Sequence, residues 1–436
     1  MRARYTEYMT AWRQAPLRSA GIRHGVIMWA ALMLAGGLDY GVNVLAGRWL
    51  QPAQYGIFVC VGAILQVLVY LSLAIRNVVA VYTAKLGVES GSFKQVGDFV
   101  RRAWRWSWWR GLIAAALMAL ISPFLAPLLR LPNPWPLWAA SPMMLLFFVR
   151  PVTDGALQGM QVFAGLGVVQ VTQSVLRLFF AAGLIWLGWQ AVGAIVALPL
   201  ACTVVLMLAL WWLRPYFRAR GELLARPVSW HYSSYTLLGL AAFGVLANLD
   251  ALFVKHFFNP RMAGNYGPVV TLAKISLFLP LAIGIILLPK AVQRRALGRD
   301  ARPILLLALT GALVPGLVLT IFYSLFPGWL VGVIFTAAYA NPGIVLALAS
   351  LAASLYAGLN IWLNYALSLE RPAFIYALVG VLVWQGVGMF MFGRENLVHM
   401  TMVMVSAGVI GNLAGFITSW HIVPAPRAVR EEVIGP

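Results

Sequence analysis

Two stretches of this chain share one pattern: "LDYGVNVLAGRWLQPAQYG" at 38–56 and "LDALFVKHFFNPRMAGNYG" at 249–267. Both begin with Leu-Asp and end with Tyr-Gly at the same separation. Further along, "LSLAI" at 71–75 aligns with "LPLAI" at 279–283 after a shift of three residues. Self-similarity at a fixed, long period indicates a duplicated structural unit. The chain is therefore predicted to consist of two similar halves.

The composition places both halves in a membrane. Of 436 residues, 62% are hydrophobic and only 10% are charged, and no soluble domain of this size buries that much apolar surface. Runs of about 20 apolar residues cross about 30 Å of hydrocarbon. A signal peptide is not expected, because the first run is long and follows a basic tail. Twelve spans are predicted, at 24–46, 55–84, 108–129, 137–158, 163–187, 191–213, 234–257, 264–289, 303–325, 343–367, 371–393 and 396–420.

The basic residues predict the orientation of these spans. Of the 32 Lys and Arg residues, 23 fall on the side of the two tails and four on the opposite side. Cytoplasmic loops retain Lys and Arg, so both termini are expected in the cytoplasm. The net charge of +20 then faces anionic membrane lipids, and no nucleic-acid partner is expected.

Two six-helix halves joined after an even number of spans run parallel, which is a transporter architecture. The expected fold class is an all-α polytopic membrane protein with about 12 transmembrane helices in two pseudo-symmetric six-helix lobes. The predicted divisions are a basic cytoplasmic tail at 1–23, an N-terminal lobe at 24–213, a cytoplasmic linker at 214–232, a C-terminal lobe at 233–421 and a cytoplasmic tail at 422–436.

Eight charged residues lie inside the predicted spans. Each costs about 2.5–3.5 kcal/mol near the bilayer centre, so these side chains must face the protein interior. Five cations exceed three carboxylates by two, which predicts a positive cavity for an anion. The planar fork of arginine suits phosphate in particular. The eight residues are Asp39, Arg76, Arg150, Asp154, Arg177, Asp250, Lys255 and Lys274.

Helical spacing extends this prediction to neutral residues. Gln173 and Arg177 share one face of the fifth span, and Asn360 lies on a polar stripe of the tenth. Asp154 follows Arg150 by four residues and is predicted to form a structural ion pair with it. Lys255 lies near a span end, where it is expected to snorkel. The substrate-binding candidates are Arg76, Arg150, Arg177, Lys274, Gln173 and Asn360.

The two cysteines, Cys60 and Cys202, offer neither a disulfide framework nor metal-ligand spacing. No metal site and no cofactor are predicted. A phosphate-gripping Gly-x-x-x-x-Gly-Lys-Ser/Thr loop is missing from the sequence, so the chain is not expected to hydrolyse nucleotide itself.

Two longer stretches resemble a known family. They are "RWLQPAQYGIFVCVGAILQVLVYLSLAIRNVVAVYTAKL" at 48–86 and "ANLDALFVKHFFNPRMAGNYGPVVTLAKISLFLPLAIGIILLPKAV" at 247–292. Both are similar to the bacterial polysaccharide exporters, the lipid-linked oligosaccharide flippases of the multidrug/oligosaccharidyl-lipid/polysaccharide superfamily. The resemblance implies a V-shaped bundle in the bacterial inner membrane that alternates between inward and outward openings.

The same resemblance implies a substrate and a driving force. An isoprenoid-diphosphate-linked glycan would move from the cytoplasmic to the outer leaflet, with its diphosphate in the cationic lumen, and a polysaccharide polymerase or ligase would be a partner. Asp39 and Asp250 lie in the first and seventh spans, where cation-coupled members of the superfamily often keep an acid. Proton or sodium antiport is one interpretation of these acids. Neutralisation of a basic neighbour is the other.

Three rival functions are weighed on sequence features. A multidrug exporter of the same superfamily shares the fold, but a carrier of cationic drugs is expected to show the opposite charge surplus. A major-facilitator carrier usually has a Gly-x-x-x-Asp-Arg-x-Gly-Arg loop, which this sequence lacks. A glycan polymerase or glycosyltransferase needs a sizeable outer loop with catalytic groups. The longest outer connection, 326–342, carries no charge, and Glu395 is the only outer carboxylate, so the chain is not expected to be an enzyme.

Overall fold

A computed structural model describes residues 17–90, 93–160, 162–218, 230–296, 302–368 and 372–419, and nearly all of them are helical. The first bundle contains α2 (Leu17–Trp49), α3 (Pro52–Ser90), α4 (Phe93–Leu128), α5 (Trp135–Gly159), α6 (Phe163–Leu184), the π-helical turn η1 (Ile185–Trp189) and α7 (Gln190–Arg218). The second contains α8 (Trp230–Leu246), α9 (Leu249–Phe257), α10 (Pro260–Ala296), α11 (Arg302–Leu325), α12 (Pro327–Ile334), α13 (Ile344–Ser368), α14 (Ala373–Phe392) and α15 (Leu397–Ser419).

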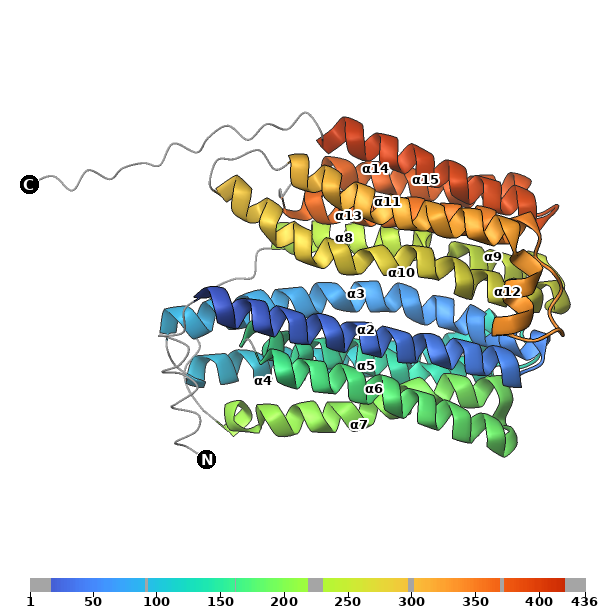
Figure 1. The fold of residues 1–436 in the computed structure, drawn as a ribbon. Coiled ribbons are helices and arrows are strands. Elements are labelled where there is room, and N and C mark those ends of the chain that lie inside the picture. The colour runs from blue at the N-terminus through green and yellow to red at the C-terminus, as the bar shows by residue number, and fades with distance from the viewer. Residues whose placement is uncertain are drawn as a thin grey trace, which may run out of the picture.

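The predicted fold class is confirmed. Figure 1 shows α2–α7 and α8–α15 as two bundles of long helices lying side by side. Large apolar side chains cover their outer surfaces, such as Phe124 with 79% of its area exposed, as lipid-facing helices require. Among the described residues, eight helical stretches are long and apolar enough to cross a bilayer, or nine if the bent pair α8–α9 is one span. One stretch, 163–214, includes the reversal at Gly188, whose φ is +88°, and so contains both α6 and α7.

The seventh span departs from the prediction of one continuous helix over 234–257. The chain bends by 43° between α8 and α9. At this break, the side-chain amide of Asn248 donates a hydrogen bond of 2.8 Å to the carbonyl oxygen of Gly244. A polar side chain that bonds to its own helix competes with the backbone ladder and favours a bend.

At one end of the molecule, α3 and α10 bring the two lobes together through glycines. A Cβ atom at Gly56 would lie 3.0 Å from the backbone nitrogen of Gly264, and one at Gly264 would overlap the carbonyl oxygen of Pro52. The Tyr55 hydroxyl and Thr271 Oγ1 form a buried hydrogen bond of 2.6 Å beside this contact. Small residues let transmembrane helices approach backbone to backbone.

Residues 326–342, which we call the strap, reach from the second lobe to the first at the same end (Figure 1). Arg48 of α2 donates hydrogen bonds to the carbonyl oxygens of Ile334 (3.0 Å) and Val333 (2.6 Å), the last residues of α12. Helix-terminal carbonyls lack intrahelical partners, and a cation there satisfies them. The Tyr339 hydroxyl donates to Gly47 O at 2.8 Å in a buried hydrogen bond. The strap therefore closes this end, which the charge distribution predicts to be the outer one.

The glycine contact leads to a first prediction. Gly264→Ala is expected to separate the lobes at the strap end, because the new methyl group overlaps Pro52 of the other lobe. Overpacking of this kind costs about 1–3 kcal/mol, which shifts a two-state equilibrium about 5- to 150-fold. Electron spin resonance distances between labels at exposed positions 49 and 329, with both native cysteines replaced by serine, measure the separation.

Gly62→Ala is the matched control for this experiment. Gly62 lies on α3, and a Cβ atom there would have no neighbour within 4 Å. The control is expected to keep the parent distance distribution. An unchanged distribution in Gly264→Ala would show that the contact does not hold this end closed.

Candidate functional site

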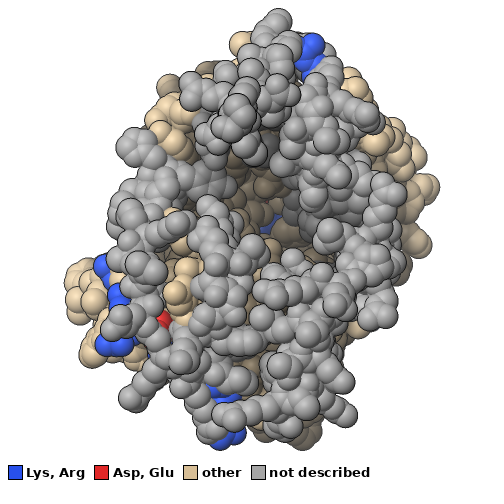
Figure 2. Space-filling model, turned by 90° about the vertical axis from the view of Figure 1, so that its left-hand side faces the viewer, with Lys and Arg blue, Asp and Glu red and all other residues tan. Residues whose placement is uncertain are grey.

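A cavity of about 730 Å³ lies between the two lobes. Its wall contains residues of α2, α3, α5, α6 and α7 from the first lobe and, among the described residues, only α10 from the second. Figure 2 views the molecule from the end opposite the strap and shows that this face is hollowed at its centre, with basic side-chain atoms visible inside. A mostly apolar pocket of about 300–1,000 Å³ with a few polar groups is typical of small-ligand sites.

The cavity gathers most of the charged residues predicted inside the spans. Among the described residues, its wall holds four cations and two carboxylates, a surplus of two positive charges. The predicted site residues that lie on the wall are Arg76, Arg150, Arg177, Lys274, Asp39, Asp154 and the neutral candidate Gln173. Asn360, Asp250 and Lys255 are not among the wall residues.

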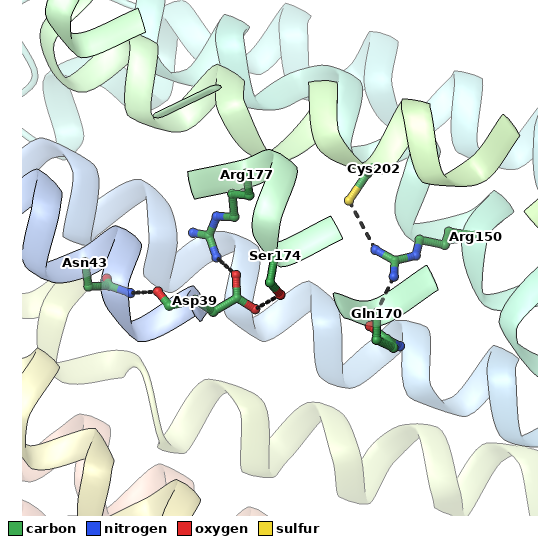
Figure 3. Close-up of polar contacts among 7 residues, drawn as sticks. All are labelled: Asp39, Asn43, Arg150, Gln170, Ser174, Arg177 and Cys202. Atoms are coloured by element: carbon green, nitrogen blue, oxygen red, sulfur yellow. Dashed lines mark hydrogen bonds and ion pairs between the residues drawn. The ribbon is translucent and has the colours of Figure 1, made fainter. Parts of the chain in front are cut away.

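Arg177 of α6 is paired with Asp39 of α2 (Figure 3). Arg177 Nη1 donates to Asp39 Oδ1 at 2.9 Å, and Ser174 Oγ donates to Oδ2 at 3.2 Å. The side chain of Asn43 anchors the backbone by donating to Asp39 O at 2.9 Å. Because the sequence places Ser174 and Arg177 three residues apart on α6, both reach the same carboxylate. Asp39 therefore has a basic neighbour, Arg177, as the interpretation that Asp39 neutralises a nearby cation requires.

Arg150 of α5 is held by three elements. Its Nε lies 3.3 Å from Asp154 Oδ2, one helical turn away, and the two side chains are 11% and 8% exposed. Nη2 donates to Gln170 Oε1 of α6 at 3.2 Å, and Nη1 donates to Cys202 Sγ of α7 at 3.3 Å (Figure 3). Sequence spacing predicts the Asp154 contact, whereas nothing in the spacing indicates Cys202. These neighbours fix the direction of the guanidinium group.

Arg76 and Lys274 carry the surplus charge. Arg76 forms no ion pair or hydrogen bond with the described part of the chain, and its buried Nε has no partner. Its charge interacts at longer range with Asp154, which Arg150 already engages. Lys274 Nζ donates to a neutral group, Asn248 Oδ1, at 2.6 Å. Arg76 lies on α3 and Lys274 on α10, so each lobe contributes one cation that contacts no carboxylate of the described residues directly.

Asp250 lies behind Lys274 in the second lobe. Its side chain interacts electrostatically with Lys274, and its Oδ2 accepts a hydrogen bond of 2.9 Å from the Tyr266 hydroxyl. Its Oδ1 is buried and has no hydrogen-bond partner among the described residues. Asn248, at the helix break, contacts Lys274 and was not a sequence candidate. Within the described residues, no three His, Cys, Asp or Glu side chains gather as a metal site.

Two expectations need correction. Asn360 does not reach the cavity, because α13 packs behind α10, and its side-chain oxygen accepts a hydrogen bond of 2.8 Å from Asn364 on the same helix. Lys255 does not snorkel, because its side chain is only 3% exposed.

Comparison with known proteins identifies the fold. No protein-family profile matches the chain, and no curated protein matches it in sequence. A multidrug-resistance MATE transporter of the MOP superfamily in an inward-facing conformation matches in structure with a TM-score of 0.68 at 11% identity, over 90% of this chain and 98% of the other. The lipid II flippase MurJ in an inward closed conformation matches with a TM-score of 0.68 at 11% identity, over 90% and 87%.

A third similar structure is distinguished by the polarity of its binding pocket. It is a MOP superfamily transporter from Pyrococcus furiosus, described as having a binding pocket of reverse polarity that suggests a different function. Its TM-score is 0.59 at 14% identity, over 91% of this chain and 95% of the other. The chain thus has the fold of MOP superfamily transporters. At these identities the charges in the cavity, rather than the fold, must discriminate between functions.

Proposed function

We propose that this protein is a flippase that moves an isoprenoid-diphosphate-linked oligosaccharide from the cytoplasmic to the outer leaflet of the bacterial inner membrane. The observation that supports this function is a pair of cations on the wall of one cavity between the lobes, Arg76 and Lys274, neither of which contacts a carboxylate of the described residues. A diphosphate diester is a dianion, so its charge complements this surplus. It would enter without breaking either ion pair.

The surrounding pairs make the site selective for such a dianion. Arg150 and Arg177 are already neutralised by Asp154 and Asp39, yet each guanidinium has more donors than its partners use. They can add hydrogen bonds to phosphate oxygens while contributing little net charge. Because the cavity is partly removed from water, each charged contact is stronger than it would be at the protein surface.

Gln173 is the neutral member of the proposed binding site. It lines the cavity, and its buried Oε1 has no hydrogen-bond partner in the described part of the chain. An amide oxygen in this position can accept a hydrogen bond from a sugar hydroxyl, which neither a phosphate nor a lipid tail can donate. We assign it to the glycan part of the ligand.

The sign of the charge separates this function from the second candidate, a cation-coupled multidrug exporter. Similar structures include MATE transporters, so the fold alone permits export of drugs. A cavity with two surplus positive charges repels the cationic compounds that such an exporter would carry. The lipid II flippase among the similar structures supports the first candidate. Since the similar structures are transporters, a polymerase or glycosyltransferase is the weakest candidate.

A proton or sodium gradient is the proposed driving force, with Asp39 and Asp250 as the coupling residues. Asp250 is the stronger candidate for a coupling residue, because its buried Oδ1 has no partner among the described residues and can bind a cation or a proton. Asp39 would first have to leave Arg177. The delivered glycan would then be used by a polymerase or ligase at the outer surface.

Reconstitution tests the proposal. In proteoliposomes, a fluorescent lipid-diphosphate sugar is expected to reach the opposite leaflet faster than in protein-free vesicles, as measured by quenching with an impermeant reductant. A cationic dye in the same vesicles is expected to stay where it is loaded. Movement of the dye without movement of the glycan lipid would identify a drug exporter instead.

A further inference from the structure

The exposed surface of α4 carries a stripe of arginine and tryptophan at one level. All five of its side chains are exposed, including Trp106 at 45% and Trp109 at 62%. Their spacing of three and four residues places them on one face of the helix. We call this set the α4 stripe; it consists of Arg102, Arg105, Trp106, Trp109 and Arg110.

The same face becomes purely apolar immediately beyond the stripe. Its exposed side chains there are Ile113 (57%), Leu117 (50%), Leu120 (68%) and Phe124 (79%). Tryptophan and arginine are typical of the headgroup level of a bilayer, and aliphatic residues of its hydrocarbon level. From Arg110 to Leu128 the helix rises about 27 Å, close to one hydrocarbon thickness. The face therefore reproduces the polarity profile of a single phospholipid.

The arginines of the α4 stripe are arranged to bind an anion. The guanidinium carbon of Arg110 lies 3.8 Å from the centre of the Trp106 ring. Side chains on a helix lean toward its N-terminus, so Arg110 reaches back to the headgroup level. Stacking on the ring uses the face of the guanidinium and leaves its N–H edge for an oxyanion. Within the described residues, neither Arg102, Arg105 nor Arg110 has a carboxylate partner, whereas neighbouring Arg101 is paired with Asp98.

We propose that the α4 stripe is a binding site for the headgroup of an anionic phospholipid. The phosphate contacts the three arginines, the two tryptophans flank the glycerol region, and the acyl chains lie along Ile113 to Phe124. Charge complementarity selects an anionic lipid over a zwitterionic one. A water-soluble partner would cover the charged turns but not the apolar face that continues from them.

The bound lipid would act on the lobe that holds the ion pairs. A Cβ atom at Gly111 of α4 would lie 2.9 Å from the carbonyl oxygen of Leu145 on α5, the helix of Arg150 and Asp154. Helices packed this closely move together. A lipid held by the α4 stripe therefore anchors the first lobe to one leaflet while the second lobe moves relative to it.

Native mass spectrometry of the detergent-solubilised full chain tests this site. The probes are phosphatidylglycerol and phosphatidylcholine with identical acyl chains. The parent protein is expected to retain phosphatidylglycerol preferentially. Each arginine near a membrane surface contributes about fivefold to anionic-lipid binding, so Arg102→Gln/Arg105→Gln/Arg110→Gln should lower the apparent affinity for phosphatidylglycerol about 100-fold. Affinity for phosphatidylcholine should change little.

Two control variants separate this site from other basic groups. Arg394→Gln removes an arginine that lies 4.6 Å over Phe390 at the strap end of the molecule, a similar pairing at the other membrane surface. Arg76→Gln removes a cavity cation. Both are expected to keep the parent preference. If the triple variant retains it, or if Arg76→Gln loses it, the α4 stripe is not the binding site.

Discussion

Arg76→Gln is expected to slow translocation of a lipid-diphosphate sugar about 30- to 1,000-fold in proteoliposomes, and Lys274→Gln is expected to do the same. Each change removes one of the two cations that lack a carboxylate in direct contact, and each leaves one negative charge of a partly desolvated ligand unmatched. Losing one partner of such a pair costs about 2–4 kcal/mol, which corresponds to the stated range. Initial rates of leaflet exchange provide the measurement.

Two further variants show whether charge or packing is responsible. Arg76→Lys keeps the positive charge and should retain a large part of the rate, although it loses the forked geometry. Ser72→Ala, one turn away on the same cavity wall, should behave like the parent protein because the Ser72 hydroxyl bonds only to its own helix. Parent-like rates in both glutamine variants would remove the proposed diphosphate site.

Asp154→Ala is expected to lower the free energy of unfolding by about 3–5 kcal/mol. The carboxylate and Arg150 are 8% and 11% exposed, so the mutation leaves an almost buried guanidinium with only neutral partners. Unfolding in mixed detergent micelles, followed by circular dichroism, measures the change. Asp154→Arg, which places like charges one turn apart, should yield little folded protein.

Glu395→Ala is the control for this prediction, because Glu395 and His399 have the same spacing in an exposed pair, with 72% and 46% of their side chains accessible. Its free energy of unfolding should change by less than about 0.5 kcal/mol. A different result for Asp154 is equally informative. If Asp154→Ala folds with parent stability but does not transport, the carboxylate serves the ligand or its coupling ion rather than the packing of α5.

Hydropathy and helical spacing are sufficient to predict the long helices and the Arg150–Asp154 pair. Both depend on residues close together in the sequence, where a period of 3.6 determines which side chains meet. The excess of cations inside the predicted spans also follows from the sequence, because it is a count of residue types that does not depend on packing. Because charged side chains avoid lipid, we expect Arg76, Arg177 and Lys274 to face the protein interior, and all three line the cavity.

Packing between helices could not be derived in the same way. Asn360 and Lys274 both lie on polar faces of apolar spans, yet only Lys274 faces the cavity, because the rotation of each helix is set by neighbours distant in sequence. The bend at Asn248 accompanies a hydrogen bond from its side-chain amide to the backbone of its own helix. Sequence spacing does not show whether that amide bonds to its own backbone or to another polar group. Cys202 contacts Arg150 only because α5 and α7 pack together.

The strap end combines two kinds of attachment whose separation would follow a definite order. Arg48 is exposed and grips main-chain oxygens, so water can replace both of its bonds as soon as they stretch. The Tyr55–Thr271 bond and the glycine contact are buried, so water can replace the hydrogen bond only after the two lobes have begun to separate. The exposed bonds of Arg48 would therefore break first, and the buried contacts between α3 and α10 would break afterwards. Since Arg48 binds carbonyl oxygens rather than side chains, its two hydrogen bonds place no requirement on the side chains of Val333 and Ile334, as long as the helix ends at the same place.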